Sequence, residues 1–287
     1  MRLLGRIIAV VGALALLIVG YGYIEATATP RVVHYTVKSA RWTGAPIVIA
    51  LISDTHAALP DMPPERLARV AAQIGALRPD LIVLAGDFTG RLHNRTGAVS
   101  PQGATRPFAA MRAPLGVFAV LGNHDMGYDI TKQPELAAAV ERGLSTSGVR
   151  VLRNRAVRVG ALWIAGTDDP DFGQADITRA LADVPARAPV VMVFHNPDLL
   201  AGVPNARVAL ALAGHTHGGQ VAPFGYALVL PMVHRNWARG LVWNQGTPMV
   251  VTSGVGVSHW PARIGVPPEI ALIRLEGSTR SAGTPAR

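Results

Sequence analysis

Five short polar motifs are spaced along the chain, and their residue types are those that bind divalent metal ions. In chain order they are Asp54-Thr55-His56, Gly86-Asp87, Asn123-His124-Asp125, His195 and His215-Thr216-His217. The chain has no cysteine, so thiolate ligands and cysteine nucleophiles are excluded. A metal site must therefore use imidazole, carboxylate and amide groups. Such a mixed nitrogen and oxygen set favours Mn, Fe or Zn over Ca or Mg.

The chemistry expected of these motifs is hydrolysis of a phosphoester bond. Asp87 has two carboxylate oxygens and can bridge two ions, so we expect a dinuclear centre. Two divalent ions beside two carboxylates leave the site positively charged, and a phosphate monoester or diester is attracted to it. A pair of ions also lowers the pKa of bound water, which supplies hydroxide as the nucleophile. The predicted ligands are Asp54, His56, Asp87, Asn123, His195, His215 and His217.

Five other residues are candidates for proton transfer or substrate binding. His124 is not needed as a ligand, so we expect it to protonate the leaving oxygen, with Asp125 orienting its ring. Arg263 is a candidate substrate contact, because a guanidinium group suits phosphate oxygens. His93, after the Gly-Asp motif, and His259, in a late loop, are further candidates. Taken singly, each of these last three residues is more often structural than functional.

Each motif directly follows a short apolar run of the length of a buried strand. The runs cover residues 47–52, 81–84, 117–121, 190–194 and 208–212. In α/β sheets, ligands bind beyond the carboxyl ends of the strands, so we expect the five motifs to converge there. A continuous apolar run indicates a strand that is buried on both faces, which requires helices outside the sheets.

The remaining pattern predicts the architecture that positions these motifs. Helices are expected at residues 63–77, 106–111, 134–147 and 175–182, and further strands at 32–37, 149–152, 156–159, 162–165, 238–242, 249–252 and 270–275. The first half alternates strands with helices, whereas the second half has many strands and few helices. We therefore predict an α/β fold of two packed mixed β-sheets flanked by helices, an α/β/β/α sandwich, preceded by one N-terminal hydrophobic helix.

The N-terminal segment carries an uncharged apolar run from Ile7 to Ile24, which follows Arg2 and Arg6. As a helix this run would span about 27 Å, close to the thickness of the bilayer hydrocarbon. It is either a membrane anchor or a secretory signal that is cut near Ala28, where small residues alternate. The basic residues before the run favour an N-terminus inside and a catalytic domain outside the cytoplasm.

These features divide the chain into an anchor or signal segment (residues 1–28), a connector (29–45), a catalytic domain (46–276) and a disordered tail (277–287). The formal net charge of +9 reflects a shortage of acidic residues, because Asp and Glu total only 18 and basic runs are missing. Nucleic-acid binding is therefore not expected. A basic surface instead suits an anionic membrane or an anionic substrate.

In order and spacing, the motifs resemble those of the calcineurin-like metallophosphoesterase superfamily. The resemblance makes residues 46–276 a metallophosphoesterase domain and His124 its catalytic histidine. It also implies which side chains bind each ion. One ion would bind to Asp54, His56, Asp87 and His217, and the other to Asp87, Asn123, His195 and His215.

Three late segments, residues 214–220, 253–256 and 263–269, are similar to the bacterial membrane-associated YaeI/YkuE-type branch. That branch implies a membrane-associated enzyme and a lipid-linked phosphoester, including UDP-diacylglucosamine-type substrates. The Asp-Arg pair of the related Ser/Thr protein phosphatases is missing after Asp87, which disfavours that activity. The alternative is a membrane-anchored metal- or phosphate-binding module without turnover, although no ligand position is substituted.

Overall fold

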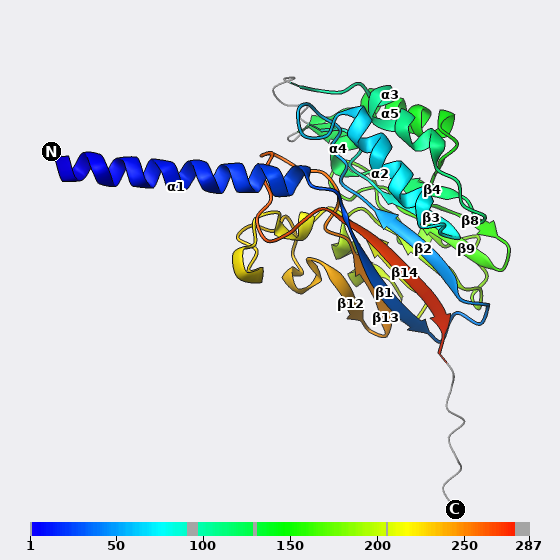
Figure 1. Ribbon diagram of the computed structural model, residues 1–287. Helices are drawn as coiled ribbons and strands as arrows, with labels where there is room; N and C mark the ends of the chain where they lie inside the picture. Colours follow the sequence, from blue (N-terminus) through cyan, green and yellow to red (C-terminus); the bar gives the residue numbers. More distant parts are fainter. Residues whose placement is uncertain (1, 91–96, 129–130, 205, 279–287) are drawn as a thin grey trace, which may run out of the picture.

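The computed structural model describes residues 2–90, 97–128, 131–204 and 206–278. Two six-stranded sheets pack face to face, helices cover their outer faces, and helix α1 (Arg2–Thr27) projects from the domain (Figure 1). This architecture is the predicted sandwich with one N-terminal hydrophobic helix. His93 and residues 279–287 of the predicted tail lie outside the described residues.

The first sheet combines strands from both ends of the domain. Its order is β1 (Arg31–Ser39), β14 (Glu269–Gly277), β2 (Ile47–Ile52), β3 (Leu81–Ala85), β4 (Val117–Val120) and β7 (Arg150–Val151). All neighbours are parallel except β14 and β2, which are antiparallel. The strand expected at residues 32–37 is thus an edge strand, β1, which pairs along its whole length with β14.

The second sheet has a parallel centre and antiparallel edges. Its order is β12 (Gly240–Asn244), β13 (Thr247–Val251), β11 (Leu210–Ala213), β10 (Val190–Val193), β9 (Leu162–Gly166) and β8 (Arg155–Val159). β12 and β8 pair antiparallel with their neighbours, and the inner pairs are parallel. A separate hairpin joins β5 (Gly127–Tyr128) and β6 (Thr131–Lys132). Both large sheets are therefore mixed.

Apolar side chains from both sheets fill the space between them. Ile49, Leu51 and Val83 of the first sheet share one buried cluster with Val191 and Leu212 of the second. Every residue of β3, β10 and β11 is buried, because these central strands are covered on both faces. This double burial is the physical reason for their continuous apolar runs.

Helices α2 (Pro64–Ala76), α3 (Pro101–Thr105) and α5 (Pro134–Thr146) cover the outer face of the first sheet with the 3-10 helix η1 (Arg106–Ala110). In α2, Leu67, Val70, Ala71 and Ile74 recur at helical spacing and are all buried. The helix expected at residues 106–111 is instead the 3-10 helix η1, because Pro107 has no N–H for an α-helical bond.

Shorter elements cover the outer face of the second sheet. They are the single-turn helix α6 (Ile177–Ala180) and the 3-10 helix η2 (Pro197–Gly202), which bury Ala180 and Leu200 against that face. The helix expected at residues 175–182 is therefore shorter than predicted. Asp176 caps its start and Leu181 already has a non-helical backbone.

Helix α1 is joined to the domain by its last turns. Residues 2–21 are exposed, whereas Gly22 and Ala26 are buried. The backbone N–H of Arg263 donates to the carbonyl of Gly22 at 2.9 Å, and the buried guanidinium of Arg66 donates to that of Ala26 at 2.9 Å. Helix α1 is long and apolar enough to cross a membrane, by length and composition. No linker separates its exposed part from the domain.

Candidate metal centre

The five motifs meet at one edge of the molecule, beyond the carboxyl ends of strands from both sheets. Asp54 follows β2, Asp87 follows β3, and the short helix α4 (Asn123–Met126) begins soon after β4. His195 follows β10, and the 3-10 helix η3 (His217–Gly219) carries the last motif beyond β11. The packing of the two sheets thus brings residues from distant parts of the chain together.

Most of the predicted ligands have a left-handed backbone, which residues other than glycine rarely adopt. They are Asp54, His56, Asp87, His215 and His217, with φ values from 42° to 71°. Each such residue costs on the order of 1 kcal/mol or more and persists only where the surrounding structure imposes it. Backbone strain of this kind gathers at sites that bind or react.

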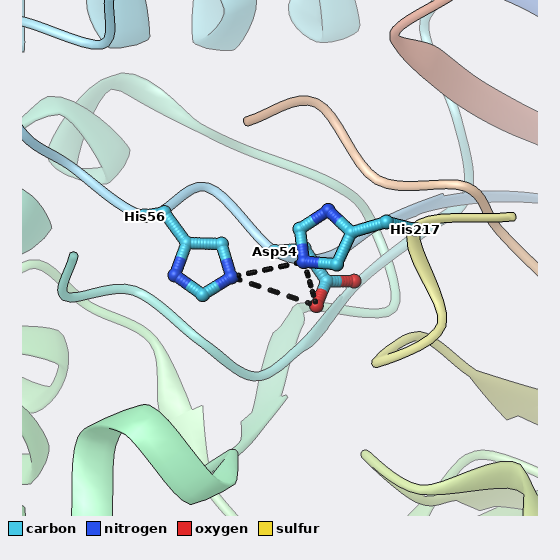
Figure 2. Close-up of side chains that lie close together, drawn as sticks. All are labelled: Asp54, His56 and His217. Carbon is cyan, nitrogen blue, oxygen red and sulfur yellow. Dashed lines mark hydrogen bonds and ion pairs between the residues drawn. The ribbon is translucent and has the colours of Figure 1, made fainter. Parts of the chain in front are cut away.

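The first group of ligand atoms comes from Asp54, His56 and His217 (Figure 2). Nε2 of His56 lies 3.1 Å from Nε2 of His217 and 4.0 Å from Oδ1 of Asp54. Nε2 of His217 lies 3.5 Å from the same oxygen. Oδ1 of Asp54 is buried and has no hydrogen-bond partner among the described residues. A buried carboxylate oxygen without a hydrogen bond among the described residues therefore faces two imidazole nitrogens.

The second group combines Asp87, Asn123, His195 and His215. Oδ1 of Asn123 lies 3.1 Å from Nε2 of His195 and 3.1 Å from Nδ1 of His215, and these two nitrogens are 3.1 Å apart. Oδ2 of Asp87 lies 3.3 Å from Nε2 of His195 and 3.4 Å from Nε2 of His56. One oxygen of Asp87 thus stands between the two groups.

Backbone carbonyls assign the hydrogen of three imidazole rings. Nδ1 of His195, Nδ1 of His56 and Nε2 of His215 face carbonyl oxygens at 2.7, 3.3 and 2.9 Å, those of Ala85, Thr89 and Pro231 respectively. The other nitrogen of each ring then faces into the site. In the neutral rings of His56 and His215 that nitrogen carries a lone pair that a cation can use. The donor set of both groups fits a divalent metal.

The electrostatics of the site agree with this fit. Burial lowers the pKa of His56 to about 3 and that of His215 to about 4, so both imidazoles are neutral and able to bind a metal. At His195, burial acts in the same direction, but the carboxylates of Asp87 and Asp54 outweigh it and raise the pKa well above its usual range. A proton on His195 therefore supplies positive charge in the metal-free protein.

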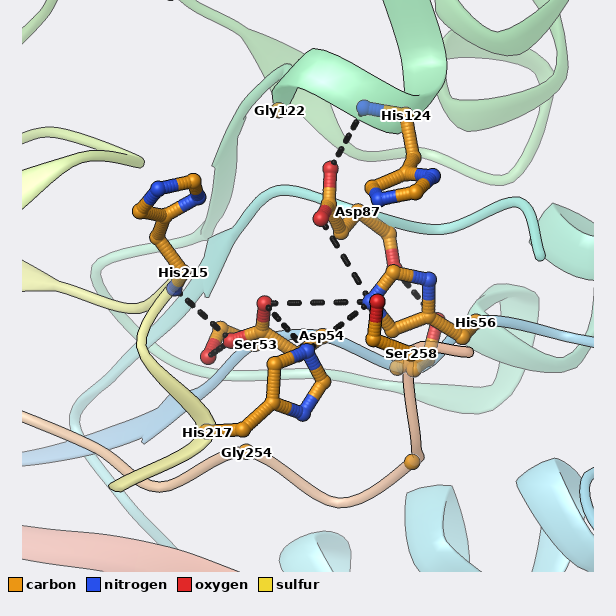
Figure 3. A network of polar contacts seen from close by, with 12 residues as sticks. Ser53, Asp54, His56, Asp87, Gly122, His124, His215, His217, Gly254 and Ser258 are labelled. Carbon is orange, nitrogen blue, oxygen red and sulfur yellow. Dashed lines mark hydrogen bonds and ion pairs between the residues drawn. The ribbon is translucent and has the colours of Figure 1, made fainter. Parts of the chain in front are cut away.

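His124 stands beside Asp87, and Figure 3 shows both among the ligands. The backbone N–H of His124 donates to Oδ1 of Asp87 at 2.9 Å. Its ring packs edge-on against the ring of His56, with centroids 4.8 Å apart. His124 is thus next to the carboxylate of Asp87.

Asp125 has a different position from the one expected. Its carboxylate is fully buried and accepts the backbone N–H groups of Asp87, Phe88, Thr89 and Gly122 at 2.8, 2.8, 3.1 and 3.0 Å. Both oxygens are used by these bonds, so the predicted role of orienting the His124 ring does not fit. Asp125 instead holds the turn that carries Asp87 against the start of α4.

A cavity of about 630 Å³ opens over the ligand atoms. Its polar wall includes Asp87, Asn123, His124, His215 and His217. Apolar side chains also line it, those of Val221, Leu228, Val229, Pro231 and Trp260. The cavity can therefore hold a ligand with one anionic end and one apolar part.

The sequence matches the family described as Calcineurin-like phosphoesterase over residues 47–219, the stretch that contains every predicted ligand. The chain belongs to this family. The resemblance stated from the motifs is thereby confirmed, and so is the YkuE-type branch.

Several relatives of this calcineurin-like phosphoesterase are similar over nearly its full length. An "Uncharacterized metallophosphoesterase" of Aquifex aeolicus is 30% identical over 274 residues, which are 92% of this chain and 98% of that protein. YkuE of Bacillus subtilis is 28% identical over 90% of this chain and 91% of its own length. A "Transmembrane protein with metallophosphoesterase domain" of Danio rerio is 27% identical over 89% of this chain and 60% of its own length.

Arg263 lies beneath the site of this phosphoesterase rather than on the cavity wall. Its side chain is 0% exposed. The guanidinium donates to the carbonyls of Ser253, Gly256 and Val266 at 2.8, 3.0 and 3.0 Å. The predicted contact with a phosphate oxygen therefore does not fit this position. Arg263 braces the loop of residues 253–256, which packs against Asp54.

His259 and His93 are the two remaining candidates for substrate contact. His259 is exposed and lines the cavity, with its ring centroid 6.3 Å from that of His124. A contact between His259 and the substrate stays a prediction. His93 lies outside the described residues.

Ser53 and the apolar lining of the cavity were not predicted from the sequence. The hydroxyl of Ser53 donates to Oδ2 of Asp54, which also accepts the backbone N–H of His215 at 3.0 Å. The position of Ser53 directly before Asp54 was the feature of the sequence that could have indicated this hydrogen bond. Most of the apolar lining comes from residues 221–231 after η3, a segment without regular periodicity that gave no indication of this role. Trp260 comes from the loop before β14, next to the predicted contact His259.

Proposed function

We propose that the protein binds two divalent metal ions and hydrolyses phosphoester bonds with a metal-activated hydroxide. The position of Asp87 carries the proposal, because one of its oxygens lies 3.4 Å from His56 and 3.3 Å from His195. A shared carboxylate between two nitrogen-rich groups is what a dinuclear centre requires. One ion would be held by Asp54, His56, Asp87 and His217, and the other by Asp87, Asn123, His195 and His215.

Two such ions, when bound, would lower the pKa of water and offset the negative charge of the phosphate. The chain itself supplies orientation and a proton. His124 lines the cavity beside Asp87, in a position to donate a proton to the oxygen that leaves. Asp125 fixes the Asp87 turn through its four backbone bonds, and the carbonyl of Ala85 fixes the ring of His195.

The proposed substrate carries an apolar group next to its phosphoester, as in a lipid-linked phosphate. The support is the mixed lining of the cavity, in which Leu228, Val229 and Trp260 share one space with the proposed metal ligands. The sequence is poor in the basic runs that a nucleic acid would need. A monoester or a diester of a lipid meets this requirement. The pyrophosphate of a UDP-diacylglucosamine-type lipid would also need a domain that faces the cytoplasm.

Activity of two variants tests the proposal. Full-length protein loaded with Mn should hydrolyse an aryl phosphodiester or monoester. Asp87→Asn removes the charge of the bridging group, and His124→Gln removes the proton donor. We expect each to lower kcat/KM by roughly 10²–10⁴-fold. Elemental analysis separates the two causes, because Asp87→Asn should lose metal whereas His124→Gln should keep it.

His34→Gln is the matched control, because this histidine is exposed on the edge strand β1, away from the ligands. It should leave activity and metal content unchanged. Wild-type rates in both Asp87→Asn and His124→Gln would refute the mechanism. A protein that binds metal but hydrolyses no aryl, nucleotide, sugar or lipid phosphoester would instead be a binding module without turnover.

We also propose that α1 stays on the mature protein as a membrane anchor. A cut near Ala28 would remove the carbonyl of Ala26 and the packed turn at Gly22. The buried guanidinium of Arg66 would then lose a partner, which is costly for a buried charge. These contacts favour a retained helix over a cleaved signal.

A further inference from the structure

A set of exposed apolar side chains lies on the two loops that contribute to the cavity, and Leu228, Val229 and Trp260 line it directly. We call this set the apolar lip, and it consists of Phe224, Tyr226, Leu228, Val229, Val233 and Trp260. Phe224 is 100% exposed, Val233 is 81% exposed and Trp260 is 77% exposed. Single exposed apolar residues are ordinary, but a contiguous group of this size at a cavity marks an interaction surface.

The lip lies on the side of the domain from which α1 emerges. Figure 1 shows the yellow segment between η3 and β12, with the orange loop before β14, next to the base of α1. The same loop holds the helix, because Arg263 donates to the carbonyl of Gly22 and Gly265 donates to the carboxylate of Glu25 at 2.9 Å. Hydrogen bonds also join the two parts of the lip, since Gln220 donates to the carbonyl of Trp260 at 3.0 Å.

The length of α1 sets the distance between the lip and a membrane. The apolar run from Ile7 to Ile24 continues past Gly22, where the helix already packs against Ala262. Ile24 itself is 69% exposed. If this run fills the hydrocarbon layer, the domain surface around Ala262 must lie at the membrane boundary. No linker exists that would let the domain move away.

Charge around the lip agrees with a lipid surface. Residues 221–240 contain no acidic residue and include Arg235 and Arg239, both exposed. The nearby carboxylate of Asp198 is engaged by the backbone N–H groups of Val233 and His234 and by the His234 ring. Basic side chains next to apolar ones are attracted to anionic headgroups while the apolar groups enter the interfacial layer. Trp260 and Tyr226 are also the residue types that settle at this depth.

We propose that the apolar lip inserts into the interfacial layer of the bilayer that α1 spans, so that the cavity opens at the membrane surface. A phosphoester that resides in the bilayer can then reach the metal centre without crossing water. Entry of a substrate from the bilayer rests on the proposed function, whereas insertion of the apolar lip into the membrane does not. The proposal is therefore that lipid, and not a protein partner, covers the apolar lip.

Fluorescence quenching tests the position of the lip. Full-length protein is placed in nanodiscs of phosphatidylcholine and phosphatidylglycerol, with or without bromine on the acyl chains. The contribution of Trp260 is the difference between wild type and Trp260→Phe. Trp243, which is 53% exposed on β12, gives the matched control through Trp243→Phe. We expect brominated lipid to abolish most of the Trp260 contribution and to spare that of Trp243.

An equal Trp260 contribution in both lipids would overturn the proposal. So would a dimer in the nanodiscs that Phe224→Ser disrupts, because the lip would then be covered by a second copy of the chain. Both results are independent of hydrolysis.

Hydrolysis rates on a soluble substrate and on a membrane-bound substrate test whether the substrate enters through the apolar lip. The double variant Phe224→Ser with Val233→Ser changes two lip residues that do not line the cavity. The double variant should hydrolyse a soluble aryl phosphate at the wild-type rate. Its rate on a nitrophenyl phosphodiester with a long alkyl chain, presented in vesicles, should be several-fold lower than that of wild type. Equal rates on the vesicle substrate would contradict entry through the lip. If wild type fails on the soluble substrate, the proposed function fails, and quenching still decides the position of the lip.

Discussion

The turn that carries Asp87 packs so tightly against Gly122 that no side chain fits between them. A methyl group at Gly122 would overlap the carboxylate of Asp87 and lie 2.7 Å from its backbone nitrogen. We expect Gly122→Ala to displace the bridging group, reduce the metal content and lower hydrolysis by roughly 10²-fold, the usual effect of a misplacement near 1 Å. Elemental analysis and steady-state kinetics measure both effects.

Gly75→Ala is the control for this variant. Gly75 lies in α2 with open space around it, so alanine there should be neutral or stabilise the helix by about 1 kcal/mol. A Gly122→Ala protein with full metal content and full activity would show that the close packing at Asp87 has no functional role.

Residue types determine which parts of the site were predictable. Asp54, Asp87 and His195 were predicted as ligands because five polar motifs of metal-binding residue types each follow an apolar strand, in order along the chain. One such motif alone is more often structural than functional. The positions of Asp125 and Arg263 were not predicted, because their partners are backbone N–H and carbonyl groups, which nearly every residue has. A bracing role of this kind leaves no pattern in the sequence.

At the scale of elements, strands were easier to predict than short helices. The central strands are buried on both faces, so their sequence is apolar at every position and their ends are marked by polar motifs. By contrast, α4 and η3 are single turns that hold ligands, and their backbone is set by packing at the ends of the sheets. Local sequence preference carries little information about such turns.

The docking of α1 can be tested with two glycines of the same helix. A side chain at Gly22 would meet Ala262 at 3.0 Å, whereas Gly12 has open space around it. We expect Gly22→Leu to separate the helix from the loop that contains Ala262 and Arg263, and to destabilise the domain by about 1–3 kcal/mol. Thermal unfolding of the full-length protein in detergent measures this loss.

Gly12→Leu should leave the midpoint unchanged, since it adds the same side chain to the exposed part of the helix. A Gly22→Leu midpoint equal to that of wild type would mean that the contacts of α1 with the domain contribute nothing to stability.

For the whole molecule, we predict the orientation in the membrane from the charge before the apolar run, although Arg31, Lys38 and Arg41 after it weaken this bias. Arg2 and Arg6 precede the apolar run, which favours an N-terminus in the cytoplasm and a domain on the other side. Alkaline phosphatase fused after Arg287 should therefore be active in the extracytoplasmic space. Activity of a cytoplasmic reporter alone at the same position would reverse the proposed topology.

The insertion of β14 between β1 and β2 has a consequence for how the protein is made. During synthesis the ribosome completes β1 long before β14, and in the described sheet β14 is the sole neighbour of β1. The first strand must wait, unpaired, until nearly the whole chain has emerged, which exposes it to aggregation. A transcript cut short before Glu269 would thus yield a polypeptide in which β1 has no partner strand. Such a polypeptide would be bound by chaperones or degraded by proteases and would not form a shorter active enzyme.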